Sequence, residues 1–84
     1  MVIFYHSKFK QQFRKLPKEV KSAAIKREKI FRQNPFDPRL KTHKLHGELS
    51  EFWSFSINYQ CRVIFDFVDE NTVRFYNIGK HDIY

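Results

Sequence analysis

The feature that most constrains the fold is a change to a two-residue period from Phe52 onward. Trp53, Phe55 and Ile57 share one face, which is the alternation of a half-buried strand. The next run is apolar on both faces and suits a central strand, with Arg62 as an interruption near its start. A third run of strand-forming residues follows a short polar turn. These patterns predict an antiparallel meander with strands at 52–57, 61–68 and 72–78 and hairpins at 58–60 and 69–71.

The first half of the chain predicts one strand and two helices. Residues 1–5 are strand formers, and Ser7 can cap a following helix. Pro17 ends this helix and suits the first turn of a second, which we expect to run to about Arg32. The predicted order is β-α-α-β-β-β, a small single α+β domain over residues 1–84 in which two helices pack on one face of the sheet. The apolar face of the first helix comprises Phe9, Phe13 and Leu16.

Charge and cysteine content narrow the class of protein. The 84 residues include 16 Lys and Arg against 9 Asp and Glu, a formal net charge of +7. Such an excess favours an anionic partner: nucleic acid first, an acidic protein second, a membrane surface third. The single cysteine, Cys61, excludes an intramolecular disulfide framework and a Cys-based zinc site. The opening lacks the pattern of a signal peptide and no apolar run would span a membrane, so we expect a cytoplasmic protein.

The meander brings several polar residues to one rim of the sheet, because the start of its second strand lies beside the ends of its first and third. An arginine at the start of a central strand needs an anion to face. A phosphate is one such anion, and a salt bridge to Asp82 is the alternative. For the closing residues, a frayed polar terminus is the alternative to a functional role. The residues expected at this rim are Arg62, Ser56, Lys80, His81 and Tyr84.

The basic connection at 39–47 supplies further candidates, namely Lys41, His43, Lys44 and His46. Three histidines could bind zinc, but no cysteine or nearby acidic ligand completes the set, so neither a metal nor another cofactor is expected. The same groups suit RNA cleavage without a metal. A base takes the proton from the ribose 2′-OH, a cation stabilises the charged phosphorane, and an acid protonates the leaving 5′ oxygen. His81 or His43 would act as base or acid, Arg62 as the cation, and Tyr84 as a stacking or proton-donating group.

Three segments resemble the RelE/ParE superfamily of toxin–antitoxin toxins. They are His43–Gly47, the strand segment Cys61–Phe65, which is similar to the family's Tyr-Arg-aliphatic-aromatic strand, and the ending Ile78–Tyr84. With the β-α-α order they extend over nearly the whole chain, and the ending is most similar to the RelE- and YafQ-like ribonuclease branch. The resemblance implies a RelE/ParE-like fold and a ribosome-dependent, metal-independent mRNA endoribonuclease that acts by 2′-OH attack and inhibits translation.

The resemblance also implies residue roles. Arg62 matches the strand arginine of RelE, His43 a histidine of the YafQ-like pattern, His81 the catalytic histidine of YafQ, and Tyr84 the terminal aromatic. Ser54 and Ser56 stand where RelE has lysines, and Ser56 and Gln60 about where YafQ-like toxins have a histidine and an aspartate. His46 is the candidate to replace these missing groups. The residues expected to bind RNA or phosphate are Lys44, Lys41, Lys80 and Ser56.

The implied partners are a cognate antitoxin that covers this rim and mRNA in the ribosomal A site, with the basic helix faces contacting rRNA. Two alternatives stay open from the sequence. One is a ParE-like toxin that inhibits DNA gyrase on the same fold. The other is an RNA-binding module without catalytic activity, which would bind with strong salt dependence and cut nothing.

Overall fold

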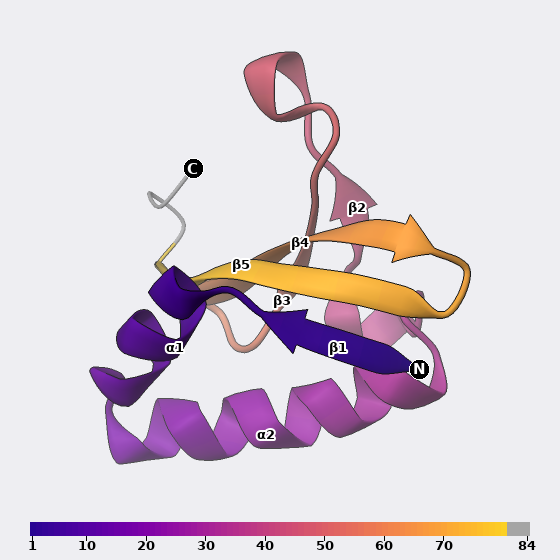
Figure 1. Cartoon of the computed structure of the whole chain (residues 1–84). Coiled ribbons are helices and arrows are strands. Elements are labelled where there is room, and N and C mark those ends of the chain that lie inside the picture. Colours follow the sequence, from indigo (N-terminus) through magenta and orange to yellow (C-terminus); the bar gives the residue numbers. More distant parts are fainter. Residues whose placement is uncertain (81–84) are drawn as a thin grey trace.

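The computed structural model describes residues 1–80 and contains a five-stranded mixed sheet with two α-helices on one face (Figure 1). Residues His81, Asp82 and Tyr84, which enter the sequence predictions, lie outside the described part of the chain. The elements are β1 (Val2–Tyr5), α1 (Ser7–Arg14), α2 (Lys18–Gln33), the 3₁₀ turn η1 (Pro38–Leu40), β2 (His43–Lys44), the 3₁₀ turn η2 (Gly47–Leu49), β3 (Trp53–Ser56), β4 (Cys61–Asp69) and β5 (Thr72–Lys80).

The strand order is β1-β5-β4-β3-β2, with β1 parallel to β5 and every other neighbouring pair antiparallel. The predicted α+β class, the antiparallel meander and the helices on one face are thereby confirmed. The structure adds one strand that the sequence did not predict. β2 pairs with the edge of β3 through His43–Ser54 and Lys44–Trp53, and its two residues are too few to produce a periodic pattern.

An irregularity in the β4–β5 pairing keeps the inner face of β5 apolar. Phe65 pairs with Phe75, whereas its neighbour Ile64 pairs with Asn77, so Tyr76 is an extra residue in β5. Without this bulge, Phe75 and Ile78 would point to opposite faces, since side chains alternate along a strand. Both are instead 2% exposed and belong to one core cluster.

α1 begins shortly after β1, and α2 begins directly after Pro17. The cap of α1 is His6, whose Nδ1 accepts a hydrogen bond from the Lys8 amide at 3.1 Å, so the predicted cap at Ser7 is wrong by one residue. Pro17 precedes α2, in agreement with its expected role as a boundary between the helices. Neither helix in the described part of the chain has the length and apolarity needed to cross a membrane.

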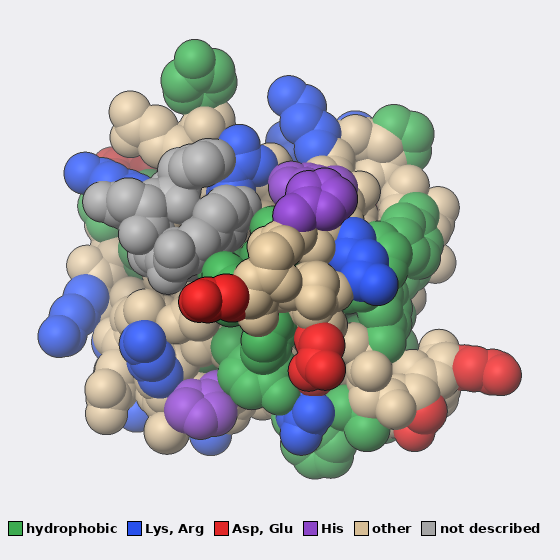
Figure 2. Space-filling view, turned by 90° about the horizontal axis from the view of Figure 1, so that it is seen from above, with side chains coloured by type: hydrophobic (Ala, Val, Ile, Leu, Met, Phe, Trp, Pro, Cys, Tyr) green, Lys and Arg blue, Asp and Glu red, His purple; other side chains and the backbone are tan. Residues whose placement is uncertain are grey.

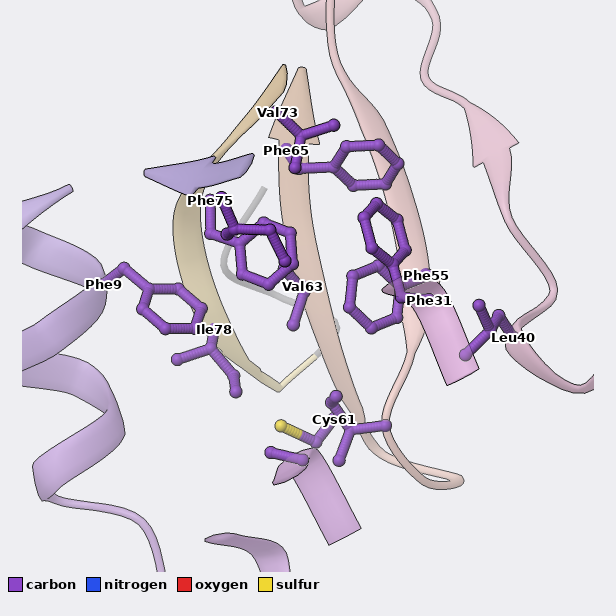
Figure 3. Close-up of a cluster of buried hydrophobic side chains, with 13 residues drawn as sticks. Phe9, Phe31, Leu40, Phe55, Cys61, Val63, Phe65, Val73, Phe75 and Ile78 are labelled. Atoms are coloured by element: carbon purple, nitrogen blue, oxygen red, sulfur yellow. The ribbon is translucent and has the colours of Figure 1, made fainter. Parts of the chain in front are cut away.

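The core lies between the helices and the sheet and is built around aromatic rings (Figure 3). Phe31 of α2 is fully buried and reaches the sheet at its centre. Its ring stacks on Phe55 at 4.8 Å between centroids and meets Phe65 and Phe75 edge-on at 5.0 and 5.4 Å. Phe9 of α1 closes one side of the cluster through a contact with Phe75 at 5.5 Å. These contacts hold the sheet in the register that positions the polar residues at its end.

Candidate active site

Arg62 is the centre of the polar arrangement at the end of the sheet. Strand pairing sets Arg62 opposite Ser56 on one side and opposite Gly79 on the other. Its Nη1 donates a hydrogen bond to the Ser56 hydroxyl at 2.9 Å. Its Nε is buried and, within residues 1–80, has no hydrogen-bond partner. A buried N–H left without a partner costs free energy, so Arg62 Nε is a candidate donor to an anionic oxygen.

Further cations surround Arg62 in a cavity of about 460 Å³. Arg27 comes from α2, Arg39 from η1 and Lys41 from the residue that follows η1. The described residues that line this cavity, which we call the basic cavity, include no acidic side chain. Like charges brought together repel one another, so the arrangement favours an anion as ligand. The rest of the lining is Ser56, Ile57, Asn58 and Tyr59.

Local hydrogen bonds hold two of these cations in place. The Arg27 Nη1 donates to the Arg39 carbonyl at 2.7 Å, which ties α2 to η1. The Arg39 guanidinium donates two hydrogen bonds to the Asp37 carboxylate, from Nε to Oδ1 at 3.0 Å and from Nη2 to Oδ2 at 2.9 Å. Hydrogen bonding from Arg39 lowers the pKa of Asp37 from 3.8 to about 2. Arg39 is therefore partly neutralised, whereas the ion pairs found within residues 1–80 include none to Arg27, Lys41 or Arg62.

His43 lies on β2, on the same sheet face as Ser54, because antiparallel partners point the same way. Its Nδ1 is 3.0 Å from the Lys41 carbonyl oxygen. A carbonyl only accepts, so Nδ1 carries the proton in this contact and Nε2 is left as the basic nitrogen of the neutral ring. His43 and Arg62 are two strands apart, on the order of 10 Å between backbones. They share no hydrogen bond within residues 1–80 and line different cavities, so a ligand that contacts both would have to reach across β3.

The other predicted residues are more dispersed. Lys44 is paired with Trp53, so its side chain is on the opposite face from His43. His46 precedes η2 and, with His43, Lys44 and Glu48, lines a separate cavity of about 440 Å³. Lys80 is exposed and pairs with Cys61, the residue before Arg62, so it lies at the predicted rim. The predictions for His81 and Tyr84 fall outside the described residues.

Seen from the side away from α2, lysine and arginine side chains are distributed around the face, with histidine side chains among them (Figure 2). Among residues 1–80, no three His, Cys, Asp or Glu side chains are close enough to hold a metal ion. A further cavity of about 440 Å³ lies between the helices and the sheet, with Phe9, Phe13 and Ile25 in its mainly apolar wall. Its charged lining residues, Lys10, Arg14 and Glu28, do not converge with Arg62, which lines the basic cavity instead.

Sequence reasoning missed three residues of the basic cavity. Arg27 follows Val20, Ala23 and Ala24 at helical spacing, and a cation on that face of the second helix was the available signal. Arg39 was part of the basic connection but was not singled out. Tyr59 was assigned only to a hairpin turn, although an aromatic residue at a turn is unusual in a segment otherwise made of Asn and Gln.

Comparison with known proteins places this geometry on a recognisable fold. No protein-family model matches the sequence, and no curated protein matches it. Solved structures do match. YafQ from E. coli strain BL21(DE3) is 17% identical over 94% of this chain and 91% of that one, with a TM-score of 0.78. The YoeB/ParE toxin from Agrobacterium tumefaciens is 13% identical over 96% and 99%, with a TM-score of 0.81.

A third similar structure is that of YoeB in the YoeB–YefM complex from Staphylococcus aureus, which is 19% identical over 96% of this chain and 97% of that one, with a TM-score of 0.77. At these identities the likeness concerns the fold. It confirms, at the level of the fold, the resemblance that the sequence motifs indicated. This chain has the fold of the RelE/YoeB-type toxins of toxin–antitoxin systems.

Proposed function

We propose that this chain is the toxin of a type II toxin–antitoxin system and that it inhibits translation by cutting mRNA in the ribosomal A site. The observation that carries the proposal is Arg62, whose guanidinium holds the Ser56 hydroxyl, keeps a buried Nε without a partner in residues 1–80, and faces a cavity lined by further cations. The fold shared with YafQ and YoeB supports the same class of activity. The toxin acts as one cytoplasmic domain over residues 1–84.

The mechanism follows from what each group can do. Arg62 stabilises the negative charge that develops on the phosphorane, because its donors are fixed before the substrate arrives. His43, with its Nδ1 proton directed at the Lys41 carbonyl, presents Nε2 to take the 2′-OH proton. His81 protonates the leaving 5′ oxygen, and Tyr84 stacks on a base; both roles rest on the sequence match. Lys41, Lys80 and Ser56 bind phosphate near the cut, and Lys44, on the other face of the sheet from His43, binds phosphate farther along the RNA. His46 is a secondary candidate for proton transfer. No step in this mechanism uses a metal.

A cognate antitoxin is the proposed protein partner. The YoeB of Staphylococcus aureus was solved in a heterotetrameric complex with YefM, which supports a partner of this class for a chain of the same fold. An antitoxin that covers the basic cavity with acidic side chains would satisfy Arg62 and block mRNA. The basic faces of α1 and α2 then serve as contacts to rRNA when the antitoxin is absent.

The test is cleavage of a defined message on programmed ribosomes, with 5′ ends mapped by primer extension. Arg62→Ala is expected to lower the cleavage rate by about 100-fold or more, as loss of one charge-stabilising donor does elsewhere. Arg74→Ala is the matched control, because Arg74 lies on the neighbouring strand but is paired with Asp66. A message with a 2′-deoxynucleotide at the cut should resist cleavage, and toxin stripped of metal ions before it is added to the ribosomes should cleave as before.

Two results would contradict this proposal. If Arg62→Ala and His43→Gln both cleave at the wild-type rate, the site assignment is wrong. If the message stays intact while induction causes DNA damage signalling, the gyrase-inhibiting alternative takes its place. RNA binding with no cleavage and no growth arrest would instead indicate the non-catalytic RNA-binding module.

A further inference from the structure

Tyr59 is 97% exposed, more than any other large hydrophobic residue in the described part of the chain. It occupies the tip of the β3–β4 hairpin, and the side chain of Asn58 is hydrogen-bonded to the backbone of this turn. The Asn58 Oδ1 accepts hydrogen bonds from the amides of Gln60 at 3.0 Å and Cys61 at 2.8 Å. The ring is therefore exposed to solvent on a hydrogen-bonded turn. A contact residue held in this way loses little conformational entropy when it binds a ligand.

A single exposed aromatic residue is common on protein surfaces and needs no explanation by itself. Phe36, at 53% exposed, shows the ordinary case, since its ring packs on Trp53 at 5.5 Å and on Phe67 at 6.0 Å. Among the ring contacts within residues 1–80 there is none to Tyr59. What distinguishes Tyr59 is its place in the wall of the basic cavity, beside three cations that come from other elements.

Backbone contacts hold two of those cations, Arg27 and Lys41, at the cavity. Arg27 is anchored by its bond to the Arg39 carbonyl. Lys41 adopts a left-handed backbone conformation, with φ of 52°, which residues other than glycine rarely adopt. Its amide donates to the Pro38 carbonyl at 3.2 Å and its own carbonyl faces His43. Lys41 is the C-cap residue of η1, so the same turn that leads into β2 sets it beside the two arginines.

We propose that Tyr59, Arg27, Arg39 and Lys41 form a subsite for one nucleotide of single-stranded RNA, adjoining the phosphate that Arg62 faces. The Tyr59 ring stacks on the base, and the cations bind the phosphates of that nucleotide and its neighbours. The cavity of about 460 Å³ is in the size range of single-ligand pockets. This inference rests on the proposed function for its ligand class, and it adds a residue that helps to choose which nucleotide lies next to the cut.

The first test measures binding without cleavage, using fluorescent 2′-O-methyl RNA pentanucleotides and fluorescence anisotropy. Tyr59→Ala should weaken binding about tenfold, since one base–aromatic stack contributes on that order. Tyr59→Phe should bind like the wild type. Phe4→Ala is the matched control, because Phe4 is also an exposed aromatic, at 56%, but lies on β1 and outside the cavity wall.

An abasic scan then locates the stack. Each base of the pentanucleotide is removed in turn, and each probe is measured with the wild type and with Tyr59→Ala. At one position, loss of the base should weaken wild-type binding about tenfold and leave Tyr59→Ala binding nearly unchanged. Equal losses for both proteins at every position would overturn the subsite. Equal thermal unfolding midpoints for the two proteins are expected, because Tyr59 is exposed.

The second test uses programmed ribosomes and separates this inference from the proposed function. Tyr59→Ala should raise KM about tenfold and leave kcat near the wild-type value, because stacking contributes to substrate binding. It should also flatten the nucleotide preference at one position beside the cut. If the wild type cleaves and Tyr59→Ala matches it in KM and preference, the subsite is wrong and the proposed function stands. If the wild type cuts nothing while the abasic scan gives the expected pattern, the subsite stands and the proposed function is wrong.

Discussion

Arg62 lowers the stability of the fold at the point where we propose that it binds a phosphate. Its Nε is buried without a partner in residues 1–80, and an unsatisfied donor of this kind costs roughly 1–3 kcal/mol. Ser56 offsets part of that cost through its 2.9 Å bond to Nη1. A site that binds an anion lowers the stability of the fold through such an unpaired donor when no anion is bound. Stability measurements can therefore detect the role of Arg62 independently of activity.

The corresponding prediction concerns the Arg62–Ser56 pair. Ser56→Ala alone should destabilise the fold by about 1 kcal/mol, because it leaves a second donor of the guanidinium unpaired. Replacing both residues, as Ser56→Ala with Arg62→Met, should give a protein about 1 kcal/mol more stable than the wild type, since an apolar side chain of similar length removes the desolvated charge. Urea unfolding measures both. A double variant less stable than Ser56→Ala would show that Arg62 is already satisfied in the folded chain.

Cys61 adjoins Arg62 but faces the core, where it is 5% exposed. Burial raises the pKa of its thiol above the ordinary value of 9.0, and hydrogen bonds from the Arg62 and Gly79 backbone oppose that rise. A raised pKa means that the neutral thiol stabilises the fold fully below pH 9.0 and that this contribution is lost as pH rises through the folded value.

We therefore expect the Cys61 thiol to react slowly with a disulfide reagent at pH 8 in the folded protein and rapidly after unfolding in urea. Cys61→Ala should flatten the loss of stability at alkaline pH, measured by urea unfolding between pH 8 and 10.5. Rapid reaction of the native thiol at pH 8 would contradict the burial of Cys61 and, with it, the packing at the start of β4.

At the scale of elements, the sequence predicted what short-range patterns determine. The meander followed from two-residue alternation, and its hairpins fixed the register that brings Ser56 opposite Arg62. It did not predict β2, whose two residues carry no pattern. Nor did it predict the bulge at Tyr76, which allows the side chains of Phe75 and Ile78 to point to the same face of the sheet.

The cap of α1 and part of the basic cavity depend on long-range contacts. The amide of His6 donates to the Phe75 carbonyl at 2.9 Å, so pairing of β1 with β5 decides where the helix begins, and His6 replaces Ser7 as the cap. Arg27 and Arg39 reach the cavity because α2 docks on η1. A pattern in one segment cannot report where a distant segment docks, and hence the cations were partly missed.

The β3–β4 hairpin offers a prediction of its own. Asn58→Ala removes two hydrogen bonds to the turn and should destabilise the fold by roughly 1–2 kcal/mol. It should also weaken RNA binding, although Asn58 need not touch RNA, because Tyr59 loses its fixed backbone. Thermal unfolding and anisotropy measure the two effects. Gln60→Ala is the control in the same turn, exposed and expected to change neither quantity by much; equal effects of the two variants would remove Asn58 as the organiser of the hairpin.

Across the whole molecule, the ion pairs of the described residues leave three of the four cations in the basic cavity unpaired. Within residues 1–80 the ion pairs join Asp66 to Arg74, Asp37 to Arg39 and Glu28 to Arg32. The Asp66–Arg74 and Glu28–Arg32 pairs lie outside the lining of the basic cavity. The Asp37–Arg39 pair neutralises only Arg39 among the cations of the cavity. The net charge of +7 raises the local concentration of an anionic polymer around the protein, and the unpaired cations of the cavity can then bind it.

That binding can be measured as counterion release. Arg39 is already paired with Asp37. If Arg27, Lys41 and Arg62 each neutralise one RNA phosphate, the logarithm of the binding constant should fall with the logarithm of salt concentration with a slope of about −2.1 for a single strand. Lys41→Gln should bring the slope to about −1.4, whereas Lys8→Gln should leave it unchanged, since Lys8 is exposed on α1 and outside the cavity wall. Anisotropy between 50 and 200 mM salt, as is usual for such slopes, separates these values. Equal slopes for the two variants would mean that RNA binds to the net charge of the surface, because only a defined phosphate contact distinguishes one lysine from another.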